Sequence, residues 1–282
     1  MAWALGNLQL HPVSGGKLWI DGGNMFGVVP KVLWERHCPA DERNRILLET
    51  NCLLVRTADQ WVLIDSGYGR LDDKSRGNYS AEDGEPLLRS LAAIGVTPQE
   101  IGIVILTHLH FDHAGGCTSR DGSARSRPTF PRAIHFVQRA EWEDAMSNVP
   151  ELAGSYFPRD LLPLEESRLV RLVDGEAEVL PGIRVHRTGG HTRGQQIVYL
   201  GEGERQAVYL ADLCPFAAHM RTFWSMAYDQ FPLEQRRIKP RVLGEAADRD
   251  WAVLFDHDPR TAAARIGRDP RQEFSVREAI AL

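Results

Sequence analysis

The sequence predicts a layered α/β fold in which β-sheets lie inside and helices cover them. Three observations lead to this prediction. Apolar runs of strand length recur along the 282-residue chain, helical patterns interrupt them, and no repeat or linker-like stretch divides the chain. A hydrophobic fraction of 43% and a charged fraction of 25% are ordinary for a globular protein of this length. We therefore expect a single domain over residues 1–282.

Short runs that alternate in polarity or are rich in β-branched residues predict the strands. Ser14-Gly15-Gly16 is a turn signal between the first two runs, and residues 57–60 join the next two as a hairpin. We expect the last run to close the strand set. The predicted strands are Leu8–Val13, Lys17–Asp21, Ile46–Arg56, Trp61–Asp65, Ile101–Leu106, Ala133–Val137, Ile183–Arg187, Gln196–Leu200, Ala207–Leu210 and Trp251–Phe255.

Three segments have helical patterns. Pro86–Ile94 has leucine and isoleucine at helical spacing and is followed by Gly95, a helix-ending residue. A second helix is expected near Arg139–Met146, and a third that starts after Pro232 and runs to about Asp248, disturbed by Pro240. Residues 147–167 are polar and contain three prolines, so loops or short helical turns are expected there.

Charge and cysteine usage restrict the partners and the compartment. The formal net charge is −5 and the basic residues are scattered, so we expect neither a nucleic-acid partner nor a membrane partner. The N-terminal residues lack the pattern of a signal peptide, and the four cysteines form no CxxC pair. These features favour a cytoplasmic protein with reduced thiols. Cys117 and Cys214 are either small buried side chains or part of the lining of a site.

Residues 108–113 are the most informative segment. They read His-Leu-His-Phe-Asp-His and follow the apolar run of residues 103–106 directly. Three imidazoles and a carboxylate are costly to crowd together unless a cation satisfies them. A strand that ends in a turn would let His108 and His110 face one point and Asp112 and His113 another. The segment is therefore a candidate for binding two neighbouring metal ions.

Three more candidate ligands follow strand ends elsewhere in the chain. His191 comes after a strand and a Gly-Gly turn, Asp212 after the run of residues 207–211, and His257 after the run of residues 251–255. Each has an ordinary explanation as a turn or capping residue when it is taken alone. Together with residues 108–113 they form the pattern His-x-His-x-Asp-His … His … Asp … His, which is far more specific.

This pattern resembles the metal-binding motif of the metallo-β-lactamase superfamily. The resemblance implies an αββα sandwich, with two central mixed sheets flanked by helices and a two-metal site at one edge. It assigns His108, His110 and His191 to one metal, and Asp112, His113 and His257 to the other. Asp212 would bridge the two metals. Asp65 matches the family's Asp-x-Gly element, which implies that it orients a ligand histidine or the ligand loop, although an ordinary turn carboxylate would look the same.

Further motifs are similar to one branch of that superfamily, the quorum-quenching N-acyl-homoserine lactonases and methyl-parathion-hydrolase-like enzymes. They are residues 21–31 (DGGNMFGVVPK), 108–116 (HLHFDHAGG) and 188–194 (TGGHTRG). The similarity extends over about residues 8 to 258. A homodimer is implied by this resemblance alone.

The ligand set implies a hydrolase. Two divalent ions roughly 3.5–4 Å apart lower the pKa of a shared water towards about 7 and polarise a carbonyl or phosphoryl oxygen. We expect the bridging hydroxide to open a lactone, with acyl-homoserine lactones among the candidates, or to cleave a related small-molecule ester. Asp112 and Asp212 are the expected catalytic carboxylates, and Asp212 would relay a proton to the leaving alkoxide. Nitrogen and oxygen ligands suit Zn²⁺, and Mn²⁺, Fe²⁺ or Co²⁺ would also fit.

One position departs from the lactonase pattern. The lactonases have a tyrosine three residues after the bridging aspartate, and this chain has Pro215 there. His219 or Tyr228 is the candidate to replace it as a polar group that assists the substrate carbonyl. The apolar segment 216–231 predicts either a wall of the site, opposite Met25 and Phe26, or core packing, or a dimer interface.

Other functions remain open on the sequence alone. A phosphotriesterase or arylesterase of the same fold would use the same hydroxide. A mononuclear iron oxygenase usually lacks the second set of ligands, so Asp112, His113 and His257 argue against it. A non-catalytic binding module would be expected to lose ligands, and all seven are present.

Overall fold

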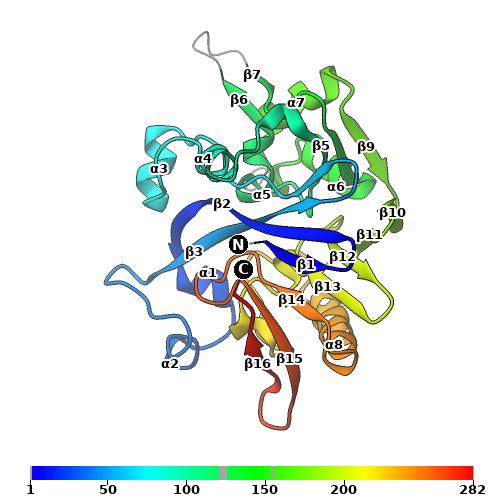
Figure 1. The fold of residues 1–282 in the computed structure, drawn as a ribbon. Helices are drawn as coiled ribbons and strands as arrows, with labels where there is room; N and C mark the ends of the chain where they lie inside the picture. The colour runs from blue at the N-terminus through cyan, green and yellow to red at the C-terminus, as the bar shows by residue number, and fades with distance from the viewer. Residues whose placement is uncertain (1, 121–125, 153, 155, 282) are drawn as a thin grey trace.

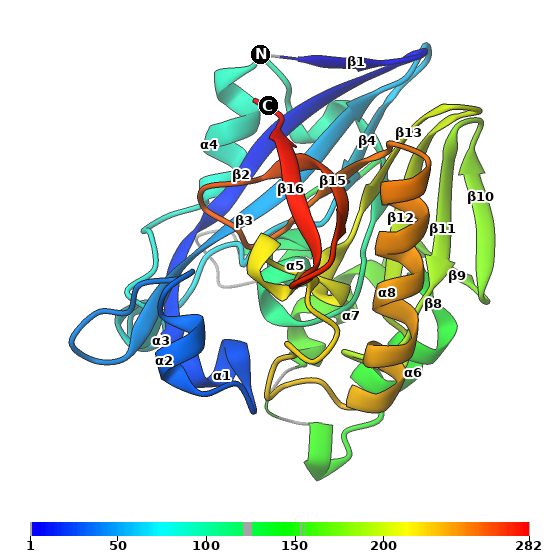
Figure 2. The same ribbon diagram turned by 90° about the horizontal axis from the view of Figure 1, so that it is seen from below.

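The computed structural model describes residues 2–120, 126–152, 154 and 156–281. Two seven-stranded mixed sheets pack face to face, and helices cover their outer faces (Figure 1). Helices α4, α5, α6 and α7 lie on one side of this pair and α8 lies on the other (Figure 2). The predicted αββα sandwich is therefore confirmed.

The first sheet has the strand order β1-β2-β3-β4-β5-β8-β9. Its strands β4, β5, β8 and β9 run parallel to one another, and the others pair antiparallel. The strand bounds are β1 Trp3–Leu5, β2 Leu8–Asp21, β3 Arg45–Arg56, β4 Trp61–Ile64, β5 Ile101–Ile105, β8 Ile134–Gln138 and β9 Val170–Val173.

The second sheet has the order β10-β11-β12-β13-β14-β15-β16, in which only the β13–β14 pair is parallel within the described residues. A small hairpin of β6 and β7 stands apart from both sheets. The strand bounds are β10 Glu176–Leu180, β11 Ile183–Arg187, β12 Gln196–Glu202, β13 Arg205–Tyr209, β14 Ala252–Leu254, β15 Ala263–Asp269, β16 Glu273–Ala279, β6 Thr118–Arg120 and β7 Ser126–Pro128.

Eight α-helices and five short 3₁₀ turns connect the strands in the described part of the chain. The helix bounds are α1 Gly22–Phe26, α2 Lys31–Trp34, α3 Asp73–Tyr79, α4 Pro86–Ala93, α5 Phe111–Ala114, α6 Arg139–Met146, α7 Pro158–Glu166 and α8 Pro232–Asp248. The 3₁₀ turns are η1 Pro98–Glu100, η2 Gly115–Cys117, η3 Pro150–Leu152, η4 Ala211–Leu213 and η5 Ala217–Met220. None of these described helices combines the length and the apolar character needed to cross a membrane.

The main core lies between the two sheets, and a further apolar layer lies under the helices on each side. Successive side chains on a strand point to opposite faces, so one strand serves two layers. On β3, Leu53 and Val55 belong to the central core, whereas Cys52 and Leu54 belong to the layer that contacts α4. This explains why β3 to β5 read as nearly continuous apolar runs.

The predicted turn at Ser14-Gly15-Gly16 is wrong, because β2 continues through it as a single bulged strand. The glycines are needed for close packing instead of chain reversal. A Cβ atom on Gly15 would lie 2.6 Å from the Cα atom of Gly67, and Gly16 adopts a φ of 110° beside Tyr68. The bulge brings β2 close to the loop that follows β4.

Two further predictions need correction. Trp251–Phe255 does not close the strand set, since β15 and β16 follow it as an antiparallel hairpin. Both strands are rich in charged residues, and their alternation is weak because the outer strand is mostly exposed. Residues 147–167 contain α7, a nine-residue helix that tolerates Pro163 in its interior. Proline at its first position and a buried leucine face explain that helix.

Candidate metal centre

The candidate ligands come from four loops at one edge of the sandwich. His108, His110 and the residues of α5 follow β5, and His191 follows β11. Asp212 lies in η4 after β13, and His257 follows β14. Because β13 and β14 are parallel, their carboxyl ends meet at the same edge. The fold therefore brings together residues that are up to 149 positions apart.

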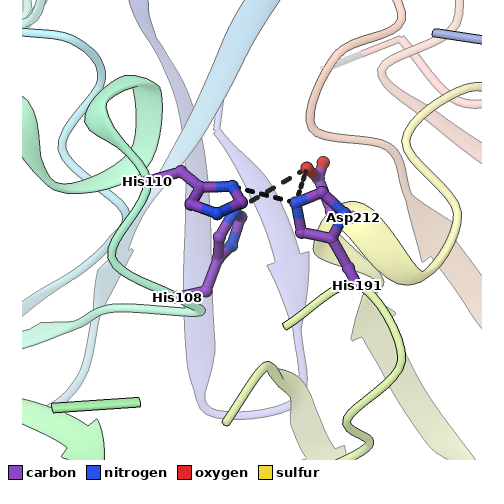
Figure 3. A group of neighbouring side chains, drawn as sticks. All are labelled: His108, His110, His191 and Asp212. Atoms are coloured by element: carbon purple, nitrogen blue, oxygen red, sulfur yellow. Dashed lines mark hydrogen bonds and ion pairs between the residues drawn. The ribbon is translucent and has the colours of Figure 1, made fainter. Parts of the chain in front are cut away.

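Four of these side chains form a first group, drawn in Figure 3. The Nε2 atom of His191 lies 3.0 Å from the Nδ1 atom of His110 and 3.0 Å from an oxygen of Asp212. The Nε2 atom of His108 lies 3.7 Å from the same carboxylate. All four side chains are buried, with relative exposures between 0% and 7%.

The second group shares Asp212 with the first and adds His113, His257 and Asp256. The Nε2 atoms of the two histidines are 3.2 Å apart, and that of His257 is 3.4 Å from Asp212. Asp112 lies at the border of this group, 3.6 Å from His257 and 4.0 Å from His113. Asp212 is thus the residue between the two groups.

The donor set fits divalent cations. Among the described residues, the Nε2 atoms of His108 and His110 and the Oδ1 atom of Asp212 are buried without a hydrogen-bond partner. Burial and the neighbouring imidazoles hold the pKa of His108 and of His110 well below the usual value, which leaves both rings neutral with a free lone pair. Buried polar atoms without a hydrogen-bond partner are rare in proteins unless a ligand completes them.

Carboxylates dominate the electrostatics of the rest of the site. Although burial opposes it, the carboxylates of Asp112 and Asp65 raise the pKa of His113 to about 9. Burial likewise opposes charge on His191, but Asp212 and Asp229 raise its pKa to about 10. The site therefore holds an excess of negative charge, which protons or metal cations would neutralise.

A second layer of groups orients the histidines. Asp65 lies 2.9 Å from the Nδ1 atom of His113 and also accepts hydrogen bonds from the backbone N–H and the hydroxyl of Thr107. Asp229 lies 2.9 Å from the Nδ1 atom of His191. The Nδ1 atom of His257 lies 3.0 Å from a backbone oxygen, that of Glu49. Such contacts fix the tautomer so that the other nitrogen faces the site.

Glu141 connects two of the ligand loops. This fully buried carboxylate accepts hydrogen bonds from the backbone N–H of Leu109, at 2.9 Å, and from the hydroxyl of Tyr156. It also accepts from the hydroxyl of Thr192, at 2.6 Å, and from the backbone N–H of Gly194. Leu109 lies between two candidate ligands and Thr192 follows a third. Glu141 therefore ties the loop after β5 to the loop after β11.

A pocket opens beside both groups of ligands. Its polar side is formed by His110, Asp112, His191, Asp212 and His257, and its apolar side by Ile20, Met25, Leu48, Tyr79, Phe111, Met226 and Tyr228. The predicted wall from residues 216–231 is therefore confirmed for Met226 and Tyr228. Others in that segment, such as Phe216 and Trp224, pack in the core, and Phe223 is 68% exposed.

The two proposed substitutes for the missing tyrosine lie in different places. Tyr228 lines the pocket, and burial raises its pKa to about 12. His219 does not line it. Its ring is buried against Phe26, with Nε2 2.8 Å from the backbone oxygen of Met25. The structure thus does not support His219 as a group that touches substrate, because core packing occupies its ring.

Several residues of the site were not predicted from the sequence. Asp256 adjoins His257 in an Asp-His-Asp run, which is a usable signal for an additional ligand. Glu141 and Asp229 have no local signal, since a carboxylate in a helix or a loop is usually a solvated residue. Cys117 and Cys214 are buried free thiols that do not line the pocket.

The chain is similar to known metal-dependent proteins. A family model of the metallo-beta-lactamase superfamily matches residues 45–119. A crystal structure of "a probable metal-dependent hydrolase" from Staphylococcus aureus superposes with a TM-score of 0.88 at 32% identity, over 99% of this chain and 100% of that one. This chain belongs to the metallo-β-lactamase superfamily.

Two further relatives are lactonases. The chain is 28% identical to an N-acyl homoserine lactonase of a Bacillus species over 156 residues, which cover 51% of this chain and 55% of that protein. The chain thus spans a little over half the length of that curated relative. AidC, "a dizinc quorum-quenching lactonase" in complex with a product, superposes with a TM-score of 0.81 at 19% identity, over 100% of this chain and 98% of AidC. At that identity the likeness concerns the fold.

Proposed function

We propose that this protein is a hydrolase that uses two divalent metal ions to open lactones or to cleave related small-molecule esters. The observation that carries this proposal is the pair of ligand groups joined at Asp212, next to a pocket with an apolar wall. The lactonase relatives support lactones as the first class of substrate to test, with acyl-homoserine lactones among them.

The two groups of neighbouring side chains support a division of the proposed ligands between two ions. His108, His110 and His191 would hold one ion, and His113 and His257 with Asp112 would hold the other. Asp212 would contact both ions, and Asp256 is a further candidate for the second. When bound, zinc or a similar ion would lower the pKa of a water and polarise the carbonyl of the substrate.

The protein's own groups then have distinct tasks. The apolar side of the pocket binds the hydrocarbon part of the substrate and excludes water. Tyr228 stays protonated at neutral pH, so its hydroxyl can donate a hydrogen bond to the carbonyl oxygen as negative charge develops there. Asp212, which lies between the two ligand groups, could carry a proton to the departing alkoxide.

The direct test is a substrate screen with a matched variant. The zinc-loaded protein is assayed against an acyl-homoserine lactone, a simple lactone, an aryl ester and paraoxon, alongside Asp212→Asn. We expect lactone turnover to exceed paraoxon turnover, and Asp212→Asn to lower kcat by about 10²–10⁴-fold with an unchanged circular dichroism spectrum. Wild-type rates in that variant, or in the protein stripped of metal, would contradict the mechanism. Preference for paraoxon would identify a phosphotriesterase instead.

Tyr228→Phe tests the tyrosine separately. The variant keeps the ring and loses only the hydroxyl, so we expect kcat for the best substrate to fall about tenfold or more while KM changes little. Tyr199→Phe, on the outer side of the second sheet, is the matched control and should leave both constants unchanged. Equal kinetics in wild type and Tyr228→Phe would remove this residue from the mechanism.

A further inference from the structure

A second cavity lies away from the metal centre. Its volume is about 360 Å³, within the range of small-molecule sites. It is lined by the segment after α2, by η5 and the residue after it, by residues 258–261, and by the start of β16. Of these elements, α2 and β16 are labelled in Figure 2. It shares no lining residue with the pocket beside the ligands.

The floor of this cavity is apolar. Met220 and Phe274 are each 4% exposed, and Cys38 and the two alanines at 217 and 218 complete the surface. Val276 on the outer strand β16 stands at its side and is 38% exposed, so the cavity is open to solvent. An apolar floor under an open mouth suits the hydrocarbon part of a small molecule.

Two arginines, Arg221 and Arg260, also line the cavity. The guanidinium of Arg221 lies 5.0 Å from the ring centroid of Trp224 and donates to the amide oxygen of Gln272 at 3.3 Å. The guanidinium of Arg260 donates to the backbone oxygen of His37. Within the residues that the structure describes, neither guanidinium has a carboxylate within ion-pair distance. Both are therefore held in place by neutral groups, and their charge is left unpaired.

Among the described lining residues, Asp258 is the one that has a carboxylate, and it does not pair with either guanidinium. Asp258 is buried, and its oxygens accept hydrogen bonds from three backbone N–H groups. They belong to Ala217, at 3.1 Å, and to Arg260 and Thr261, each at 2.9 Å. The carboxylate therefore stabilises the backbone around it and does not bind the arginines. Two arginines and one aspartate give the lining a formal charge of +1 when the imidazole of His37 is neutral.

The positive charges around the cavity also affect the imidazole of His37, another lining residue. Burial lowers its pKa, and the charges of Arg221, Arg260 and Arg36 lower it further. A neutral imidazole beside two arginines offers one more hydrogen bond to an anion. It also provides a probe of the cavity that is independent of the metal centre.

We propose that this cavity binds a small organic monoanion, a carboxylate with a short apolar chain. The two guanidinium groups would bind the carboxylate, and the floor of Met220 and Phe274 would bind the chain. A single negative charge matches the formal charge of the lining better than a phosphate dianion does. This inference does not depend on the reaction performed at the metal centre.

The test uses sodium hexanoate and the NMR signals of His37 in the metal-loaded protein, assigned with His37→Gln. Because an anion in the cavity offsets the arginine charges, we expect hexanoate to raise the pKa of His37 in a saturable manner. Arg221→Gln and Arg260→Gln should each raise the hexanoate concentration that gives half of this pKa change about tenfold or more, since each variant loses a charge-assisted hydrogen bond to the carboxylate. Arg171→Gln is the control, because Arg171 also stacks on an aromatic ring, that of Phe136 on β8.

Two more probes define the ligand class. Hexanamide, which has the chain without the charge, should leave the pKa of His37 unchanged. Sulfate should raise that pKa only at far higher concentration than hexanoate. The proposal is overturned if hexanoate does not change the pKa of His37. It is also overturned if Arg221→Gln and Arg260→Gln need the same hexanoate concentration for this change as Arg171→Gln does. It is also overturned if hexanamide and hexanoate act alike.

Discussion

At the scale of residues, each histidine of the second ligand group and His191 of the first has its far nitrogen held by another group. Asp65, Asp229 and the backbone oxygen of Glu49 hold these nitrogens at 2.9 to 3.0 Å. The rings are thereby oriented before any metal arrives. Glu141 works one step further out, because it holds the backbone of the ligand loops and not a ligand ring.

Glu141→Gln is predicted to weaken metal binding without unfolding the protein. A glutamine amide can accept on one side only, so two of the four donors around residue 141 would lose their acceptor. We expect metal affinity to fall about 10–100-fold in a chelator competition, with the far-ultraviolet circular dichroism spectrum retained. Glu166→Gln at the exposed end of α7 is the control, and equal affinity in both variants would show that Glu141 has no positioning role.

At the scale of elements, the site depends on close backbone contacts between loops. The turn η2 packs on the loop after β4, where Gly116 donates its N–H to Gly67 at 3.0 Å and Ser66 donates to the carbonyl of His113 at 2.7 Å. A Cβ atom on Gly116 would lie 2.1 Å from the backbone oxygen of Ser66. The glycines after the histidine motif are therefore needed for docking the ligand loop, not for a turn.

Gly116→Ala is predicted to lower the free energy of unfolding by about 1–3 kcal/mol, because the two backbones must separate. Gly77→Ala in α3 is the matched control. A Cβ atom there meets nothing within 4 Å, so the helix should gain about 0.5–1 kcal/mol. Urea unfolding of both variants measures the difference. A Gly116→Ala protein as stable as the wild type would show that the two backbones can move apart without loss of stability.

At the scale of the whole molecule, stability depends on histidines that fold in their neutral form. His135 on β8 is fully buried, and its Nδ1 atom lies 3.3 Å from the backbone oxygen of Leu169. Burial lowers its pKa to about 4, from a value of about 6.5 in an unfolded chain. Between these two values the unfolded chain binds a proton that the folded protein does not.

His135→Gln is therefore predicted to reduce the sensitivity to acid. As the pH falls through 6.5 the wild type loses stability, and by pH 4.5 this group accounts for about 2.5 kcal/mol. Below about pH 4 both states are protonated and the loss stops growing. Urea unfolding at pH 7 and 4.5 should show that the stability of the variant relative to the wild type rises by this amount at the lower pH. His186→Gln, at a partly exposed position of β11, should show no such rise. Parallel behaviour of the two variants would refute the assignment.

Much of the fold could be read locally. The hairpin of β3 and β4, the buried strand β5 and the bounds of α6 and α8 agree with the predictions, because period and length act within one segment. The bulge in β2 and the final strands β15 and β16 do not agree. Their form depends on contacts with other segments, which local patterns do not contain.

The superfamily, and the seven residues that lie together at the candidate metal centre, could be identified from the sequence alone. These residues can be recognised because a His-rich segment directly after a buried strand is unusual outside metal sites. Three further assignments required the packed chain: Asp256 joins the second group, Glu141 and Asp229 support the ligands, and Tyr228, not His219, faces the pocket. These assignments rest on side-chain directions and on distances between distant segments, and those exist only once the two sheets have packed together.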